Sequence, residues 1–594
     1  MNRTIMRWFV PFVLLLIAIA PLLAFFHQGL PQGHDGQDHV ARIANFYRSL
    51  SEGTIIPRWA GNLNWGFGHP ILMFLYPFSS YLASLFHFIG LSFVDATKAV
   101  FVVAYIASIL SMYLWMNAVW GKRAGVIGAL LYGFAPYRFV DMYVRMAIGE
   151  HMAFVFPPLI CYFLYKLATQ PFGFAQGRQE LRTKTYYGVG LSVSFALLIL
   201  SHNALALMFL SVIGLYVVYL FIYETKKSFC FLFSVFCFLL LGFGLSAFFW
   251  VPAYFEGKYT LRDIVTTGEA MDRFVPWTWF FYSPWNYGGG ETITKSLGIP
   301  QWIGLVASLI VFFKTKDKKL RFLLFAFCFL LFASLFIMTS TSQFLWTKVV
   351  ILQNFQFPWR FLSLTTFIAA VMGGISISQL LNMFGQKTCL PAGTAESKKQ
   401  VSKIKDLRPM IFAHCPMFTT ALLIVFCFLL IVSTSYMWQP KDYQIKDESF
   451  YTGIYQSTTD TGESSPIWTT RFMEQTPKAV IEVISGEATV RQIRRTTTVH
   501  QYQVNAKIRA ELLENTIYFP GWEVLVDGKK TDIEFQSGIH RGIMTFWVEK
   551  GEHQVTVVFR DTKLRKISNG ITVVSGIVLI LGSFIAHFLW KRKK

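Results

Sequence analysis

Long apolar runs separated by short basic stretches set the pattern of this sequence. A transmembrane helix needs about 20 predominantly apolar residues to cross the hydrocarbon core, and about a dozen runs of this kind recur along the chain. They predict a polytopic α-helical membrane protein and exclude a soluble enzyme. With the N-terminus inside, we place twelve crossings near residues 8–26, 98–119, 124–137, 152–167, 187–203, 205–222, 229–252, 300–313, 320–338, 359–383, 410–437 and 568–590.

The distribution of charge indicates on which side of the membrane each loop lies. The formal net charge is +21, which in a soluble chain would suggest a nucleic-acid partner. Here Lys and Arg gather in short stretches between the apolar runs, such as Lys122-Arg123, Lys226-Lys227 and residues 591–594. The positive-inside rule assigns such stretches to the cytoplasm. We therefore predict a multi-pass protein of the plasma membrane, with the lipid bilayer as its partner, both termini in the cytoplasm and no nucleic-acid partner.

The run at residues 71–89 does not fit this count. It is apolar enough to cross, but a crossing there would put the next basic stretch outside and invert every later loop. We therefore interpret this run as a re-entrant or interfacial helix. The transmembrane domain, residues 1–437, then carries two large outer loops at 27–97 and 253–298.

Residues 438–567 have a different pattern. Apolar and polar positions alternate with period two at residues 488–493, 499–504, 522–526 and 555–559. Turn signals such as Pro-Gly and Asp-Gly separate these stretches. The alternation predicts an extracytoplasmic β-sandwich between the last two spans, and residues 568–594 form the final transmembrane helix and a basic cytoplasmic tail. None of the seven cysteines lies in an outer segment, so no disulfide framework is indicated.

Four polar residues open the first outer loop at a helical spacing. Asp35, Asp38, His39 and Arg42 follow one another at i, i+3, i+4 and i+7, which gathers them on one face of a helix. A carboxylate pair beside basic groups could deprotonate an acceptor hydroxyl, or Asp35 and Asp38 could hold a divalent cation such as Mg²⁺ or Mn²⁺. The alternative is a capping and salt-bridge cluster on an interfacial helix. The spacing alone leaves both interpretations open.

Ionisable and polar residues recur at the predicted outer ends of three later spans. Arg145 and Glu150 precede the fourth span, His202 and Asn203 end the fifth, and Arg360 opens the tenth. Ionisable residues are costly in the membrane unless they pair or line water. The guanidinium fork of Arg360 could clamp a phosphate. The alternatives are an interhelical hydrogen bond for His202 and an interfacial anchor for Arg360.

Signatures of soluble enzymes are missing from the sequence. It has no P-loop, dinucleotide fingerprint, nucleophile elbow or zinc-binding HExxH motif. No predicted cytoplasmic loop is long enough for a nucleotide-binding domain. An activated lipid is therefore the natural source of energy for a reaction on the outer side.

Several short motifs, in their order along the chain, resemble a known superfamily. An acidic motif in the first outer loop, then Pro57-Arg58 and then an aromatic interfacial helix are similar to the GT-C superfamily of polytopic glycosyltransferases. More narrowly, the chain resembles the membrane family labelled "6-pyruvoyl-tetrahydropterin synthase-related", although nothing in it resembles the soluble pterin enzyme. The motifs that carry this narrower resemblance are His34-Asp35…His39…Arg42, Pro57-Arg58-Trp59, Gly66…His69-Pro70, Arg145…Glu150, Ser201-His202-Asn203, Phe249…Ala253 and Phe357-Pro358-Trp359-Arg360.

The resemblance implies a reaction and roles for named residues. A polyprenyl-phosphate sugar lies in the outer leaflet, and an outer-loop Asp activates the hydroxyl of a glycan, lipid or protein acceptor, which displaces the lipid phosphate with inversion. Asp35 matches the acidic motif by its neighbours, Asp38 matches it by its distance to Gly53, and Glu150 matches the second acidic motif. The residues expected to bind substrate or lipid phosphate are His39, Arg42, Arg58, Arg145, His202, Asn203 and Arg360.

The chain departs from the superfamily at one point, because Gly36 follows Asp35 where a second acidic residue is common. A metal requirement therefore stays open, and so does an inactive or lectin-like relative. The rival from another class is a transporter of lipids or lipid-linked oligosaccharides, for which twelve spans are equally usual. Transporters tend to have two related halves and charges near mid-span, whereas the halves here are unlike and the polar residues lie at span ends. The sequence favours the glycosyltransferase.

Overall fold

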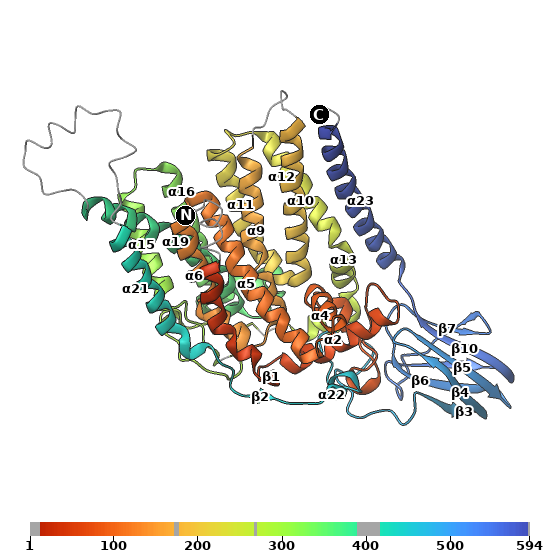
Figure 1. Cartoon of the computed structure of the whole chain (residues 1–594). Coiled ribbons are helices and arrows are strands. Elements are labelled where there is room, and N and C mark those ends of the chain that lie inside the picture. The colour runs from red at the N-terminus through yellow and green to blue at the C-terminus, as the bar shows by residue number, and fades with distance from the viewer. Residues whose placement is uncertain (1–11, 171–177, 267–269, 291, 389–415, 592–594) are drawn as a thin grey trace, which may run out of the picture.

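Long helices make up most of the computed structural model, which describes residues 12–170, 178–266, 270–290, 292–388 and 416–591 (Figure 1). Seven helices in these ranges are long and apolar enough to cross a membrane. They lie in α5 (Phe93–Trp120), α8 (Ile148–Ala153) with α9 (Phe156–Ala168), α10 (Arg178–Ser201), α11 (Asn203–Tyr223), α16 (Lys318–Ile337), α19 (Leu362–Thr388) and α23 (Lys563–Lys591). Helices satisfy their own backbone hydrogen bonds, as a segment in the hydrocarbon core must.

Further apolar helices are broken or shorter. α12 (Phe229–Leu245) and α13 (Ala247–Phe255) meet at an angle of 71°. The shorter ones cover Phe12–Phe26, Ile299–Lys314 (α15) and Ile424–Met437, which lies in α21 (Pro416–Thr434) and the turn after it. α6 (Lys122–Gly133) covers most of the predicted span 124–137. A helix or a broken pair thus accompanies the described part of each predicted apolar run, and residues 8–11 and 410–415 of two predicted spans lie outside the described ranges. The number of crossings and their orientation stay predictions.

Glycines let α19 pack closely on two neighbouring helices. A methyl group on Gly304 of α15 would lie 2.8 Å from the Cα of Gly373, and one on Gly374 would lie 2.8 Å from the Cα of Gly128 in α6. No side chain fits at such distances, so the helix backbones are in contact. This packing sets the position of the residues just before α19, which include Arg360.

One end of the helices carries the segments with the predicted site, and we call it the loop end (Figure 1). The elements there are α2 (Gly36–Ser51), α3 (Ile71–Phe74), α4 (Phe78–Phe88), the antiparallel pair of β1 (Leu30–Pro31) with β2 (Tyr443–Gln444), and α22 (Glu448–Thr452). The run 71–89 is therefore divided into two short helices. The 11 residues of α4 span about 16 Å, roughly half the hydrocarbon thickness, so this helix is too short to cross.

Eight strands between Ile481 and Phe559 form what we call the strand domain. One antiparallel sheet has the order β4-β5-β10-β7-β8 and the other has the order β3-β6-β9. The strands are β3 (Ile481–Ser485), β4 (Ala488–Arg495), β5 (Val499–Ala506), β6 (Ala510–Ile517), β7 (Trp522–Val526), β8 (Lys529–Thr531), β9 (Ile543–Val548) and β10 (Gly551–Phe559). Tyr502 and Val557 from one sheet share a hydrophobic core with Leu512 from the other. The four predicted strands lie in β4, β5, β7 and β10.

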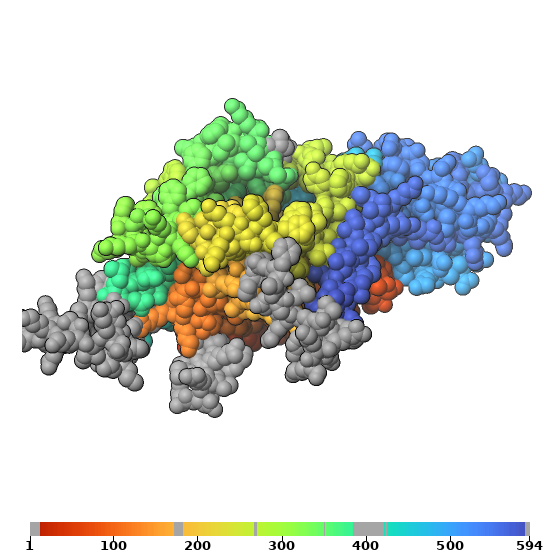
Figure 2. Space-filling model, turned by 90° about the horizontal axis from the view of Figure 1, so that it is seen from above, coloured from red at the N-terminus to blue at the C-terminus, as the bar shows by residue number. Residues whose placement is uncertain are grey.

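The strand domain is packed firmly against the loop end. Trp59, in the segment between α2 and α3, has no exposed surface, and it packs edge-on against Trp522 with ring centres 5.3 Å apart. The φ of Gly68 is +79°, and a methyl group there would lie 2.6 Å from Trp59 Nε1, so only glycine leaves room for the indole. Arg565 pairs with Glu256 at 2.8 Å. Seen from above, the domain projects to one side, and α23 leads back from it along the helices (Figure 2).

Candidate functional site

Glu150 lies at the centre of a buried polar cluster. It is in the first turn of α8, follows the π-helical turn Val140–Val144, and has 1% of its surface exposed. Its Oε1 accepts hydrogen bonds from Arg145 Nη2 at 2.9 Å and from Arg360 Nε at 2.7 Å, and its Oε2 accepts one from the Tyr137 hydroxyl at 2.8 Å. These donors compensate the desolvation of a carboxylate, which is otherwise expensive to bury.

The charges in this cluster are balanced. Arg145 Nη1 also pairs with Asp141 Oδ1 at 2.7 Å, so two carboxylates face two guanidinium groups. The Arg145 guanidinium lies 4.6 Å from the centre of the Trp359 ring, and His202 Nε2 lies 3.8 Å from Glu150 Oε1. The structure therefore brings together four residues that the sequence placed in the site: Arg145, Glu150, His202 and Arg360.

Asp35 is the N-cap residue of α2, which begins at Gly36. Its φ of −108° and ψ of 2° are not helical, but its carbonyl oxygen accepts the His39 N–H at 3.0 Å, so it lies at the start of the helix that carries Asp38, His39 and Arg42. Two further backbone hydrogen bonds link this start to the segment before α8. His34 N–H donates to Val144 O at 2.9 Å, and Asp35 N–H donates to Arg145 O at 3.0 Å. The chain before α2 is thus paired with the segment that carries Arg145.

The carboxylate of Asp35 is free. The side chain is exposed, and no residue in the described ranges forms a hydrogen bond or an ion pair with it. The protein packed around it still removes solvent, which raises the pKa of Asp35 by more than the Arg145 and Arg42 guanidinium groups lower it. A raised pKa makes the carboxylate a stronger base, and its exposure lets it meet a proton on a ligand.

Asp38 is held by the C-terminal region. The Tyr455 hydroxyl donates a hydrogen bond to Asp38 Oδ1 at 2.9 Å. Desolvation raises the pKa of Asp38, while this hydrogen bond and the Arg42 guanidinium lower it. The two aspartates of the predicted motif therefore differ, since Asp35 is free and Asp38 already has a partner.

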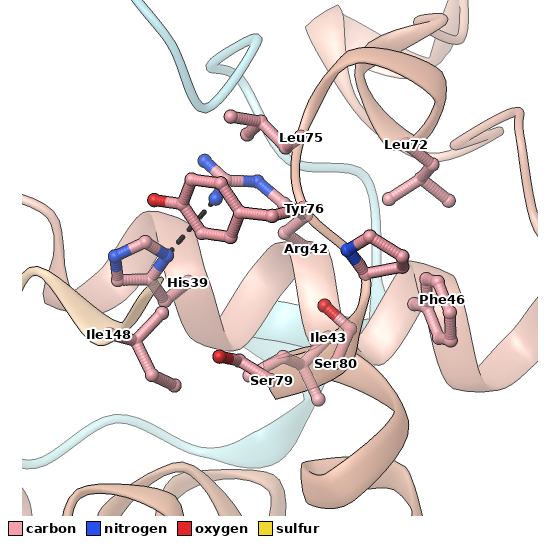
Figure 3. A pocket seen from close by; sticks show the side chains of 11 residues that line it. His39, Arg42, Ile43, Phe46, Leu72, Leu75, Tyr76, Ser79, Ser80 and Ile148 are labelled. Atoms are coloured by element: carbon pink, nitrogen blue, oxygen red, sulfur yellow. Dashed lines mark hydrogen bonds between the residues drawn. The ribbon is translucent and has the colours of Figure 1, made fainter. Parts of the chain in front are cut away.

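Arg42 and His39 line a small cavity between α2 and residues 72–80 (Figure 3). Its volume of about 10 Å³ suits roughly one water molecule. Arg42, which is 7% exposed, donates from Nη1 to His39 Nδ1 at 3.0 Å, from Nε to Thr459 Oγ1 at 3.1 Å, and from Nη2 to the Thr459 carbonyl oxygen.

These partners of Arg42 are uncharged. Burial, followed by the charge of Arg42, lowers the pKa of His39 well below its ordinary value, so the imidazole is neutral. Thr459 offers a hydroxyl and a backbone carbonyl. Within the described ranges no carboxylate forms an ion pair with Arg42, although Asp35 and Asp38 lie near enough for its charge to lower the pKa of both carboxyls.

Two predicted residues lie away from this cluster. Arg58 pairs with Asp561 at 3.2 Å and donates to Asn569 Oδ1 of α23 at 2.8 Å, so it joins the segment after α2 to α23. Asn203 is exposed at the start of α11, where its Oδ1 accepts the N–H of the next residue. Both contacts are structural, because each satisfies groups of the fold itself.

Three residues of the site were missed by sequence reasoning: Tyr137, Tyr455 and Thr459. Tyr137 lies in the same segment as Arg145, but an aromatic residue at a span end is ordinarily an interfacial anchor. Tyr455 and Thr459 each lie 417 residues from their partner on α2. No local pattern marks such pairs, and covariation between distant positions is the signal that could find them.

A divalent cation has no ready-made site here. Within the described ranges, no group of three or more His, Cys, Asp and Glu side chains is placed to hold a metal ion. Hard cations take several oxygen ligands, whereas Asp35 offers one free carboxylate and Tyr455 already engages Asp38. These donors do not fit a metal centre, so we derive no step through one.

Comparisons with known proteins show distant similarities. The sequence matches no protein-family model. A protein of Lactococcus lactis subsp. cremoris (strain MG1363), described as uncharacterized, is 24% identical over 249 residues, which are 40% of this chain and 38% of that protein. The matched part is thus less than two thirds of that relative's length.

Three solved structures are similar at low identity. A mutant arabinofuranosyltransferase AftD from Mycobacteria is 14% identical with a TM-score of 0.43, over 75% of this chain and 29% of that one. The archaeal oligosaccharyltransferase AglB from Archaeoglobus fulgidus, in complex with an inhibitory peptide and a dolichol-phosphate, is 13% identical with a TM-score of 0.43, over 78% and 61%. ArnT from Cupriavidus metallidurans, bound to undecaprenyl phosphate, is 12% identical with a TM-score of 0.38, over 74% and 76%.

Proposed function

We propose that the chain is a membrane glycosyltransferase of the GT-C type that works at the loop end. The donor is a polyprenyl-phosphate sugar, and the acceptor is a hydroxyl group of a glycan, a lipid or a protein. The proposal puts the loop end on the outer face of the plasma membrane, with twelve crossings and both termini in the cytoplasm. It treats the two sheets of the strand domain as an extracytoplasmic β-sandwich.

The observation that carries this proposal is the free carboxylate of Asp35 in a site whose other acids have partners. Asp141 and Glu150 are paired with arginines, and Asp38 accepts a hydrogen bond from Tyr455. An exposed carboxylate with a raised pKa, next to cations, has the properties of a general base. An enzyme that activates a hydroxyl group needs such a base.

The reaction then follows from the groups present. Asp35 takes the proton of the acceptor hydroxyl while the hydroxyl oxygen attacks the anomeric carbon of the sugar. The bond between that carbon and the phosphate oxygen breaks, and its electron pair leaves with the polyprenyl phosphate. Attack from the side opposite to the phosphate inverts the anomeric centre.

The leaving phosphate needs a cation, and Arg42 suits this role. Its charge has no carboxylate partner, whereas Arg145 and Arg360 share Glu150. Arg42 also lies close enough to Asp35 to lower the pKa of that carboxyl. A guanidinium fork matches two phosphate oxygens, and hydrogen bonds to a charged group are about twice as strong as neutral ones. Arg145 and Arg360 bind the phosphate as well when they release Glu150.

A transfer assay tests this proposal. Purified protein is incubated with labelled polyprenyl-phosphate hexoses and with glycan, lipid and peptide acceptors, and the glycosylated product is measured. Asp35→Asn keeps the shape of the side chain but removes its basicity, so turnover at saturating donor should fall by about 10²–10⁴-fold. The matched control is Asp38→Asn, which should keep most of the turnover because Asp38 already accepts a hydrogen bond from Tyr455.

Two results would count against the proposal. Unchanged turnover in Asp35→Asn would remove Asp35 as the base. Movement of a lipid-linked sugar across a vesicle membrane, with no transfer to any acceptor, would support the transporter instead.

A further inference from the structure

Residues 455–463 of the C-terminal region, which we call the strap, lie across the first outer loop. The strap begins with a short backbone pairing. Tyr455 N–H donates to Asn62 O at 2.8 Å, and Trp65 N–H donates to Tyr455 O at 3.0 Å. Together with the hydrogen bond from the Tyr455 hydroxyl to Asp38, this pairing anchors the beginning of the strap beside α2.

Farther along, the strap covers one edge of the Arg42 guanidinium. Arg42 Nε donates to the hydroxyl of Thr459, and Arg42 Nη2 donates to the carbonyl of the same residue. Two oxygens of one residue thus meet two nitrogens of one guanidinium edge. Arginine binds two oxygens of a phosphate in this same bidentate way. Thr459 therefore occupies, with neutral oxygens, a place that suits an anion.

Thr459 adopts an unfavourable backbone conformation to do this. Its φ is +68°, in the left-handed region, which is rare for a β-branched residue. The turn is closed by Asp460, whose carboxylate accepts the N–H groups of Gly462 at 2.9 Å and Ser464 at 3.0 Å. Backbone strain of this kind clusters at ligand clamps and switches.

From this geometry we infer that the strap occupies the donor's phosphate position on Arg42 and is displaced when a lipid phosphate binds. The inference rests on the proposed function, because it takes a polyprenyl phosphate as the ligand of Arg42. A phosphate compensates the buried charge, which the threonine oxygens do not, and displacement relieves the left-handed conformation of Thr459. Residues 458–463 move, while the Tyr455 end stays anchored. The site then opens to the acceptor only after the donor has bound.

Thiol labelling of the full-length protein in nanodiscs tests the displacement. Thr458 has no exposed surface, so the Thr458→Cys variant should react slowly with a water-soluble maleimide. Undecaprenyl phosphate should raise this rate several-fold, and undecaprenol, which lacks the phosphate, should not. The matched control is Gln456→Cys, an exposed position at the anchored end, which should react fast in every case. Mass spectrometry of the labelled peptide separates these sites from the native cysteines.

A pair of substitutions at Thr459 separates competition from a structural role. Thr459→Val removes the hydroxyl acceptor but keeps the branched shape, so undecaprenyl phosphate should bind about 3- to 10-fold more tightly. Thr459→Asn keeps a side-chain oxygen and tolerates the left-handed region, so the phosphate should bind more weakly. If both variants bind more weakly, or if neither changes, Thr459 has a structural role only and the inference is wrong.

Failure of this inference is distinguishable from failure of the proposed function. If the unmodified protein binds undecaprenyl phosphate and labelling of the Thr458→Cys variant does not change, the strap inference is wrong and the proposed donor is retained. If the unmodified protein does not bind undecaprenyl phosphate at all, both the donor class and the strap inference are wrong.

Discussion

Replacing Glu150 by Gln tests whether this carboxylate is the counter-ion of the buried cluster. Gln has the same shape, but it is neutral and offers one oxygen in place of two. Its amide N–H groups would also face the donors of Arg145, Arg360 or Tyr137, which now bond the carboxylate. The substitution therefore leaves positive charge uncompensated in a place that is 1% exposed.

The structure also indicates how large the effect should be. Arg145 keeps Asp141 as a partner, so the uncompensated charge falls mainly on Arg360. Removing one partner of a buried ion pair typically costs about 3–5 kcal/mol. In a helical domain of this size, we expect that loss to lower the Tm by roughly 5–10 °C. The assay is thermal unfolding of the purified protein at one fixed scan rate, because unfolding of membrane proteins is often irreversible.

A double-mutant cycle gives the sharper test. Arg360→Gln should also destabilise the protein, but the double variant should lose less than the sum of the two, by roughly 1–3 kcal/mol, since it removes a charge and its counter-charge together. Strict additivity, or an unchanged Tm in Glu150→Gln, would refute the counter-ion role. A loss of turnover at normal stability would return Glu150 to the catalytic role predicted from the sequence.

Three other perturbations address the base, the phosphate and the topology. The rate of sugar transfer should fall as the pH is lowered, with a midpoint above about 4, the ordinary pKa of an aspartate. The reason is that Asp35 acts as a base only when deprotonated and its pKa is raised. A midpoint below that value contradicts the assignment. Arg42→Lys should weaken binding of undecaprenyl phosphate in nanodiscs by about tenfold or more, and unchanged affinity would assign the phosphate to other arginines. Ile539→Cys, at a position 87% exposed, should react with an impermeant thiol reagent in intact cells; reaction only after permeabilisation would invert the topology.

Apolar patterning located the helices because the membrane requires a continuous apolar run for each span. The strands were only half predictable. β5 and β10 alternate between the core and water, so their period of two is visible in the sequence. β6 (Ala510–Ile517) is different, because nearly every position in it is buried and its polar Glu514 and Asn515 form hydrogen bonds inside the domain. A strand without a solvent-exposed face shows no alternation of apolar and polar residues in the sequence.

The site divides in the same way. Arg145, Glu150 and Arg360 could be grouped from the sequence because each lies near the same end of a predicted span, and span counting assigns the ends to one side. Arg58 was grouped with them by its motif, yet its partner Asp561 is near the end of the chain. The contacts that distinguish Asp35 from Asp38 also come from the distant C-terminal region. The local sequence pattern does not indicate which distant segments of the chain pack against each other.

Trp59 has a consequence for the order in which this protein is made. Its ring completes the core of a domain whose first strand begins only at Ile481. Synthesis proceeds from the N-terminus, so the segment with Trp59 and the helices before β3 exist before the strands do. Until the strands are made, the indole of Trp59 is therefore not covered by the core that later buries it. The same late segment brings Tyr455 and Thr459 to α2. A ribosome that stops before residue 455 leaves helices with an unfinished site, so the site assembles only after this segment has been made.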